Sequence, residues 1–187
     1  EMDRQPVLEG ERLLLRPLTP DDWDALFAVA SDPEVWAIHP QRDRWQEPVF
    51  RRFFADALGR GGALVVIDKV DGAVIGSSQY KEAAGGVVEI GWTFLAISHW
   101  GGSFNREMKR MMLEHAFSFV DRVEFRVGEC NLRSQRAMQK IGGSLTDRFD
   151  VVETPSGPMR HVVFEIIRES FASGPLSSRA PASAGGN

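Results

Sequence analysis

The segment SHWGGSFNREMKR, residues 98–110, joins two kinds of sequence pattern. Before it, the segments ALVVID, AVIGSSQYKE and VVEIGWTFLA are rich in β-branched and aromatic residues and are separated by turn sequences. After it, methionines recur at helical spacing. Glycines at the start of a helix leave backbone amides open to an anion, and the helix N-terminus adds partial positive charge. The segment therefore predicts a strand, an anion-binding turn and a helix in succession.

The same patterns along the whole chain predict a mixed, mostly antiparallel seven-stranded sheet flanked by about four helices, in the α+β class. The expected strands are 11–18, 63–68, 73–82, 87–96, 123–129, 145–152 and 160–168, and the expected helices are 19–30, 31–36, 47–59, one beginning at Phe104 and one within 131–143. Gly59 is the expected end of its helix. The strand–helix–strand unit around residue 104 makes two neighbouring strands parallel, and crevices at the carboxyl ends of such strands bind ligands.

Length and composition indicate one domain, residues 8–171, followed by a low-complexity tail, residues 172–187, that is rich in Ala, Gly, Pro and Ser. The net charge of −4 and the lack of a long apolar run indicate neither a nucleic-acid nor a membrane partner. A single cysteine excludes a disulfide framework and a cysteine-based zinc site, and we expect no metal. We expect a cytoplasmic protein, because no signal peptide is visible.

The anion that the glycine turn would hold can be narrowed by elimination. The turn lacks the Lys-Ser/Thr pair of a Walker loop and the spacing of the dinucleotide fingerprint. Amides of residues 101–105 would suit a pyrophosphate without a metal ion. The plain alternative is that Gly101 and Gly102 only turn the chain.

Four motifs together resemble the GNAT superfamily of acyl-CoA-dependent N-acetyltransferases, over residues 8–168. They are LEGERLLLRPLTPDDWDALFAVASDPEVW (8–36), EIGWTFL (89–95), HWGGSFNREMK (99–109) and NLRSQRAMQKIGG (131–143). The branch they resemble contains bacterial N-terminal acetyltransferases of ribosomal proteins. The loop departs from the family pattern at Ser98 and Ser103, neither of which removes a backbone amide.

The resemblance implies acetyl-CoA as co-substrate, held by strand, loop and helix residues. It implies a bulge near Gly91 that frees the backbone amides of Thr93, Phe94 and Leu95 to bind the pantetheine arm. The pyrophosphate would contact Gly101, Gly102, Ser103, Phe104, Asn105 and Arg106. It further implies that Asn131 binds pantetheine and that Ser134 lies near the sulfur. Arg133 could meet the nucleotide phosphates, or be a solvated helix residue. Asn131 and Ser134 are equally explained by helix capping.

The residues on the acceptor side are less certain from the sequence. Glu89 could take a proton from the amine, or pair with an arginine such as Arg16. His39 is the competing base, or a solvated loop residue. Trp36 and Trp45 would wall an acceptor pocket, or belong to the core.

The resulting hypothesis is an enzyme that acetylates a primary amine by direct attack in a ternary complex. The alternative is a non-catalytic acyl-CoA-binding module. The acceptor is a protein or peptide N-terminus or a small amine, and a pocket closed by the loop of residues 36–46 would favour a small molecule. Exposed aromatics in WAIHPQRDRW, residues 36–45, would also suit a homodimer contact.

Overall fold

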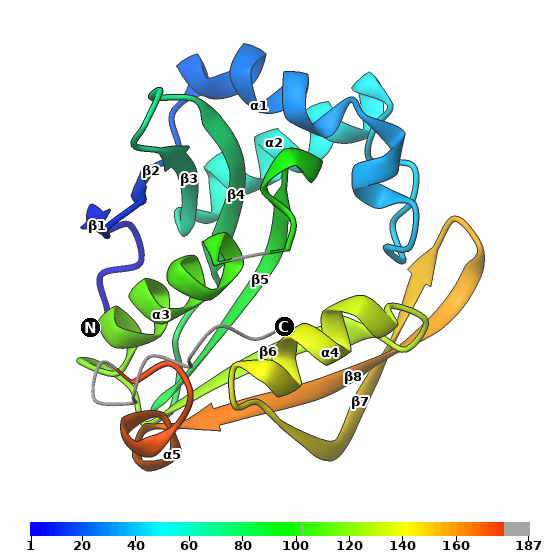
Figure 1. Cartoon of the computed structure of the whole chain (residues 1–187). Helices are drawn as coiled ribbons and strands as arrows, with labels where there is room; N and C mark the ends of the chain where they lie inside the picture. The colour runs from blue at the N-terminus through cyan, green and yellow to red at the C-terminus, as the bar shows by residue number, and fades with distance from the viewer. Residues whose placement is uncertain (102, 178–187) are drawn as a thin grey trace.

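A computed structural model of the protein describes residues 1–101 and 103–177 (Figure 1). The strands are β1 (Leu8–Glu9), β2 (Leu13–Pro17), β3 (Ala63–Asp68), β4 (Val74–Tyr80), β5 (Val87–Leu95), β6 (Arg122–Gly128), β7 (Ser144–Thr154) and β8 (Gly157–Ile167). The α-helices are α1 (Trp23–Ala30), α2 (Glu47–Arg60), α3 (Phe104–Ala116), α4 (Leu132–Lys140) and α5 (Arg168–Ser173). Three short 3-10 helices are η1 (Pro20–Asp22), η2 (Pro33–Trp36) and η3 (Ile97–His99).

The strands form one mixed sheet in the order β1-β2-β3-β4-β5-β6-β8-β7, which confirms the expected class. The neighbours β2 to β5 run antiparallel, as do β6, β8 and β7. The pair β5 and β6 is parallel, because α3 carries the chain back between them. The sequence led us to expect seven strands, and the eighth is β1, which is too short to show an alternating pattern.

The two faces of the sheet are covered by different helices (Figure 1). On one face, methionines of α3 and Met138 of α4 pack with strand residues such as Leu15 and Val123. On the other face, Leu26 of α1 and Phe50 of α2 pack with Val65 and other strand residues. The sheet therefore separates two apolar layers, and a route between them has to pass between strands.

The end of α2 differs from the expectation. Gly59 lies within the helix, and Gly61 terminates it with a φ of 72°. That left-handed conformation costs glycine little and other residues much, so Gly61 is the residue that allows the chain to leave the helix.

The C-terminal segment also differs from the expectation, because the folded part continues beyond Phe171. Helix α5 extends to Ser173, and Leu176 is 2% exposed within the core of the α3 face. A guanidinium nitrogen of Arg106 donates to the carbonyl of Pro175. Residues 178–187 of the expected tail lie outside the described residues. Across the described ranges, none of the helices has the length and apolar character needed to cross a bilayer.

Candidate functional site

The central strand β5 has a bulge that turns it away from β6. Ser77 of β4 pairs with Phe94 of β5, and Gln79 pairs with Gly91. A step of two residues in β4 therefore corresponds to a step of three residues in β5. Trp92, within this stretch, has a φ of 52°, a conformation that is uncommon for a residue with a side chain. The sequence placed the bulge at Gly91, and the structure has the left-handed residue one position later.

The bulge coincides with the divergence of the parallel pair. Pairing between β5 and β6 runs from Val87 opposite Arg122 to Glu89 opposite Glu124, and it extends no further. Because β5 continues to Leu95, the edge of β5 that faces β6 has no partner beyond Glu89 among the described strands. This is the splay that the family resemblance implied.

A cleft of about 620 Å³ occupies the gap between the diverging strands. Its lining includes Leu95 and Phe125 from the core of the α3 face, and Trp36 and Phe94 from the core of the α2 face. The cleft therefore passes through the sheet and is accessible from both layers. Two molecules that enter from opposite faces could meet at the bulge.

Eleven of the residues singled out from the sequence line this cleft. They are Trp36, His39, Thr93, Phe94, Leu95, Gly101, Asn105, Arg106, Asn131, Arg133 and Ser134. The structure does not bring Trp45, Glu89, Ser103 or Phe104 to the lining, and Gly102 lies outside the described residues.

The start of α3 opens into the cleft at Gly101, which has a φ of 70°. The first amides of a helix have no partner within it, so this end offers donors and partial positive charge. Ser103 is held by the Arg12 guanidinium, which also lies 4.1 Å from the Phe104 ring centroid. The Ser98 hydroxyl bonds the His99 ring, so neither unusual serine is directed at a ligand by these contacts.

The start of α4 is a capped helix that faces the same cleft. The side-chain carbonyl of Asn131 accepts from the Ser134 amide at 3.2 Å, which is the capping role considered from the sequence. The amide nitrogen of the Asn131 side chain makes no hydrogen bond with any residue of the described ranges. The guanidinium carbon of Arg133 lies 3.5 Å from the ring centroid of Trp100, and burial lowers the pKa of Arg133.

The lining is cationic. Within the described residues no carboxylate borders the cleft, whereas six basic side chains do: Arg106, Lys109, Arg126, Arg133, Arg136 and Lys140. A groove of this charge suits a ligand with several negative charges.

Glu89 is engaged in ion pairs and lies outside the cleft lining. One carboxylate oxygen is 2.8 Å from Nζ of Lys81, and the other is 2.6 Å from a guanidinium nitrogen of Arg126. Arg16, the partner suggested from the sequence, instead pairs with Asp22 at 2.7 Å. Both oxygens are therefore paired, as in the structural alternative that we weighed against the catalytic role.

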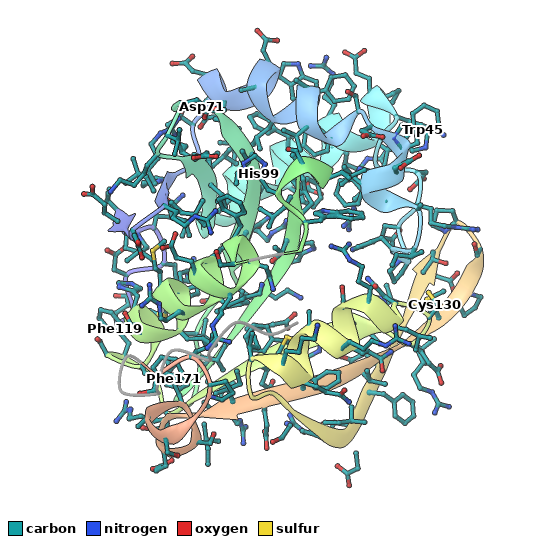
Figure 2. All side chains as sticks on the ribbon, viewed as in Figure 1. Trp45, Asp71, His99, Phe119, Cys130 and Phe171 are labelled. Carbon is teal, nitrogen blue, oxygen red and sulfur yellow. The ribbon has the colours of Figure 1, made fainter. Side chains whose placement is uncertain are left out.

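His39 lies in the lining but is a poor proton acceptor. Burial, followed by the charges of Arg44 and His161, lowers its pKa to about 3. Its Nδ1 accepts from the Gln41 amide at 2.9 Å, which occupies the lone pair that a base would use. Trp45 is 39% exposed and lies at the outer edge of the molecule (Figure 2).

The loop that carries His39 borders the cleft. Pro40 packs so closely on Gly128 that a Cβ there would lie 2.1 Å from the proline Cγ. The Gln41 side chain donates to the Glu153 carbonyl at 3.0 Å, and Arg42 donates to the Ser156 hydroxyl. The loop is therefore fastened to the hairpin of β7 and β8, beside which it lies in Figure 1.

Lys109 and His161 are two of the lining residues that the sequence did not single out. Lys109 is 7% exposed in α3, and its spacing from Asn105 and Met112 could have placed it on the inner helix face. His161 on β8 has a buried Nε2 with no hydrogen-bond partner among the described residues. Its position opposite Gly128 depends on strand pairing, which the local sequence does not reveal.

The described residues contain no group of three His, Cys, Asp or Glu side chains that could hold a metal ion. Tyr80, the chain's only tyrosine, is buried and donates to the Met112 carbonyl, and burial raises its pKa. It does not line the cleft.

Residues 12–144 match the model of the acetyltransferase (GNAT) domain family. The chain belongs to the GNAT family. It is 26% identical over 176 residues to the uncharacterized N-acetyltransferase p20 of Bacillus licheniformis, covering 89% of this chain and 98% of the relative.

Two solved structures show the same fold at lower identity. One is RimJ of Mycobacterium smegmatis in complex with CoA-disulfide, with a TM-score of 0.68, 17% identity and coverage of 88% of this chain and 86% of that chain. The other is spermidine N-acetyltransferase of Vibrio cholerae in complex with CoA and spermine, with a TM-score of 0.68 and 15% identity. The match covers 87% of this chain and 99% of that chain. The protein is accordingly an acetyltransferase that uses acetyl-CoA, and family members act on amine acceptors.

Proposed function

We propose that this GNAT protein acetylates the primary amine of a small molecule by direct attack on acetyl-CoA in a ternary complex. The observation that carries the proposal is the cleft through the sheet at the Trp92 bulge. Acetyl-CoA enters from the face covered by α3 and α4, and the amine enters from the face covered by α2. The thioester and the amine then meet where β5 and β6 diverge.

Backbone geometry supports the place of the pantetheine arm. The Ala96 amide donates to the Ile75 carbonyl at 2.7 Å, in line with the pairing of β5 and β4. Because successive amides of a strand point to opposite edges, the Leu95 amide points to the edge that β6 has left. The Thr93 amide shares that edge, and Asn131 faces it from α4. The pyrophosphate would lie at the first turn of α3, near Gly101 and Arg106.

We assign a small-molecule acceptor because the loop borders the cleft and is fastened to the hairpin. Pro40 packs on Gly128, and Gln41 and Arg42 bond to the hairpin, and these contacts favour a bounded pocket over an open groove for a chain. The absence of a carboxylate from the described lining also disfavours an acceptor with several positive charges. This choice departs from the protein N-terminus that the branch resemblance suggested.

The chemistry needs a neutral amine, a stabilised oxyanion and a protonated leaving sulfur. His161 is the group we assign to receive the amine proton, because its Nε2 is buried in the cleft without a partner among the described residues. Burial and the charges of Lys81 and Arg44 lower its pKa, as burial does for His39, but Nε2 of His161 has no partner among the described residues and keeps its lone pair for the amine proton. Ser134 donates a hydrogen bond to the sulfur.

The test is incubation of the protein with acetyl-CoA and matched amines. The panel holds small primary amines, an aminoglycoside, spermidine and peptides with free N-termini, with CoA release and product mass as readouts. We expect acetylated small monoamines, with turnover lowered by Ser134→Ala and by His161→Gln while acetyl-CoA affinity is retained. Acetylation of peptides alone would overturn the acceptor assignment. Acetyl-CoA binding without any product would favour the non-catalytic module.

A further inference from the structure

Lys109 is a buried cation without a counter-charge. It lies in the second turn of α3, is 7% exposed and borders the cleft. Its Nζ donates to the Thr93 hydroxyl at 3.2 Å and lies 5.6 Å from the Phe125 ring centroid. Among the described residues no carboxylate pairs with it, and burial alone lowers its pKa to about 8.

Such a position is costly for the fold. Removing an ammonium from water without an ion-pair partner costs several kcal/mol, and one hydrogen bond and one distant aromatic ring offset only part of that. A methionine of similar length would pack here without the cost, as Met108 and Met112 do on either side. The charge is therefore explained by an anion that arrives with the ligand.

The hydrogen-bond chain leaves Lys109 able to meet that anion. An ammonium only donates, so the Thr93 hydroxyl accepts from Lys109, and it also shares a hydrogen bond of 2.8 Å with the Ser78 hydroxyl. Two of the three ammonium protons are then unused by the described residues, and the cleft lies beside them.

The position of Lys109 separates it from the phosphate end of the cleft. It follows Phe104, the first residue of α3, by five positions, which is about 7.5 Å along a helix axis. Its partner Thr93 directly follows the bulge residue Trp92. The ammonium therefore lies at the end of the cleft where the strands diverge, which is the thioester end of the proposed ternary complex.

We propose that Lys109 is the cation that stabilises the CoA thiolate as it leaves, an inference that rests on the proposed function. The amine nitrogen forms a bond to the acetyl carbon, the carbon–sulfur bond breaks, and its electron pair remains on sulfur. The Lys109 ammonium pairs with the resulting thiolate and keeps its own proton. The proton that the acceptor amine loses passes through His161 to solvent, and solvent protonates the thiolate when CoA leaves.

The other ionisable groups on this side of the cleft are all basic: His99, Arg106, Arg133, Arg136 and Lys140. Apart from His99, which is 16% exposed in its side chain and paired with Asp68, they are on α3 and α4. They affect a bound sulfur equally in the wild type and in a Lys109 variant, so a comparison of the two isolates Lys109.

The test needs CoA alone and no acceptor. The thiolate absorbance of bound CoA is titrated with pH in the wild type, in Lys109→Met and in Thr93→Val. An adjacent cation lowers a thiol pKa by about one to three units. We expect the thiol pKa to be lower by this amount in the wild type than in Lys109→Met, and Thr93→Val to match the wild type.

Each result distinguishes the inference from its alternatives. Equal thiol pKa values in the wild type and Lys109→Met would overturn the role of Lys109 and leave the proposed function intact. Loss of the shift in Thr93→Val as well would mean that Lys109 only supports the bulge. Failure of the wild type to bind CoA would overturn the proposed function itself. Melting temperatures of both variants, which we expect to match or exceed the wild type for Lys109→Met, control for folding.

Discussion

Asn131 caps α4 with one end of its side chain, and we propose that the other end binds the co-substrate. Its carbonyl oxygen caps α4 at the Ser134 amide, and its amide nitrogen is the donor assigned to the pantetheine arm. Aspartate keeps the capping oxygen and lacks the donor. We expect Asn131→Asp to retain the wild-type melting temperature and to weaken CoA binding by about tenfold, the loss of one hydrogen bond. Calorimetric titration with CoA is the measurement, and undiminished affinity would contradict the assignment.

His39 predicts how stability depends on pH. Its pKa is about 3 in the folded protein and about 6.5 when unfolded, so between these values the unfolded chain binds the extra proton. Stability is therefore lost as pH falls below about 6.5, by up to ~1.4 kcal/mol for each pH unit. His161, whose pKa is also lowered, acts in the same direction.

Urea unfolding at pH 5 and pH 7.5 measures this contribution. We expect His39→Gln to show a smaller difference between the two pH values than the wild type, since glutamine has no proton to bind. An equal difference in both proteins would mean that His39 is solvated in the folded state.

At the scale of the elements, Glu89 fastens β5 to β6 at the last pair before they diverge. Its partners are Lys81 and Arg126, which also pairs with Asp150 at 2.5 Å. Glu89→Gln leaves two cations without this anion. We expect the free energy of unfolding to fall by about 1–3 kcal/mol, which lowers the melting temperature by roughly 2–12 °C. The low-pH limb of the rate profile should be unchanged. A flattened limb with unchanged stability would return Glu89 to the role of base.

The loop of residues 36–46 is the element that bounds the acceptor pocket in the proposed function. Gly128→Ala would place a methyl group against Pro40, where no room exists, and the loop would have to move away from the hairpin. We expect KM for the amine to rise at least tenfold, on the order of 1.4 kcal/mol, while CoA affinity stays constant. Unchanged KM would show that the loop does not bound the acceptor site, and lost CoA affinity would show a wider disturbance.

The elements around the glycine turn were predictable because each has a local cause. Turn residues separate β3, β4 and β5, and the helical period resumes at Phe104. The bulge was predicted within one residue, since glycine next to it marks the place, but a tryptophan in the left-handed region has no local signal. The pairing of Glu89 with Arg126 joins parallel strands that are distant in sequence. Lys109 was overlooked because a lysine in a helix is ordinarily on the surface.

For the whole molecule, the sheet divides two layers and the cleft joins them only where the parallel pair opens. In the proposed ternary complex, this arrangement separates the carrier of the acetyl group from its acceptor until both reach the bulge at Trp92. The basic lining, in a chain of net charge −4, concentrates positive potential where the co-substrate's phosphates would lie.

The central claim is that this cleft binds CoA, and thermal unfolding with acetyl-CoA or CoA tests it most directly, with ATP and NAD as controls. A ligand at about 100 times its dissociation constant adds about 2.7 kcal/mol of stability. For a domain of this size that corresponds to a rise in melting temperature of roughly 5–10 °C. We predict this rise with acetyl-CoA and CoA and a smaller one with ATP or NAD. No rise with either CoA compound, or an equal rise with all four ligands, would contradict the account.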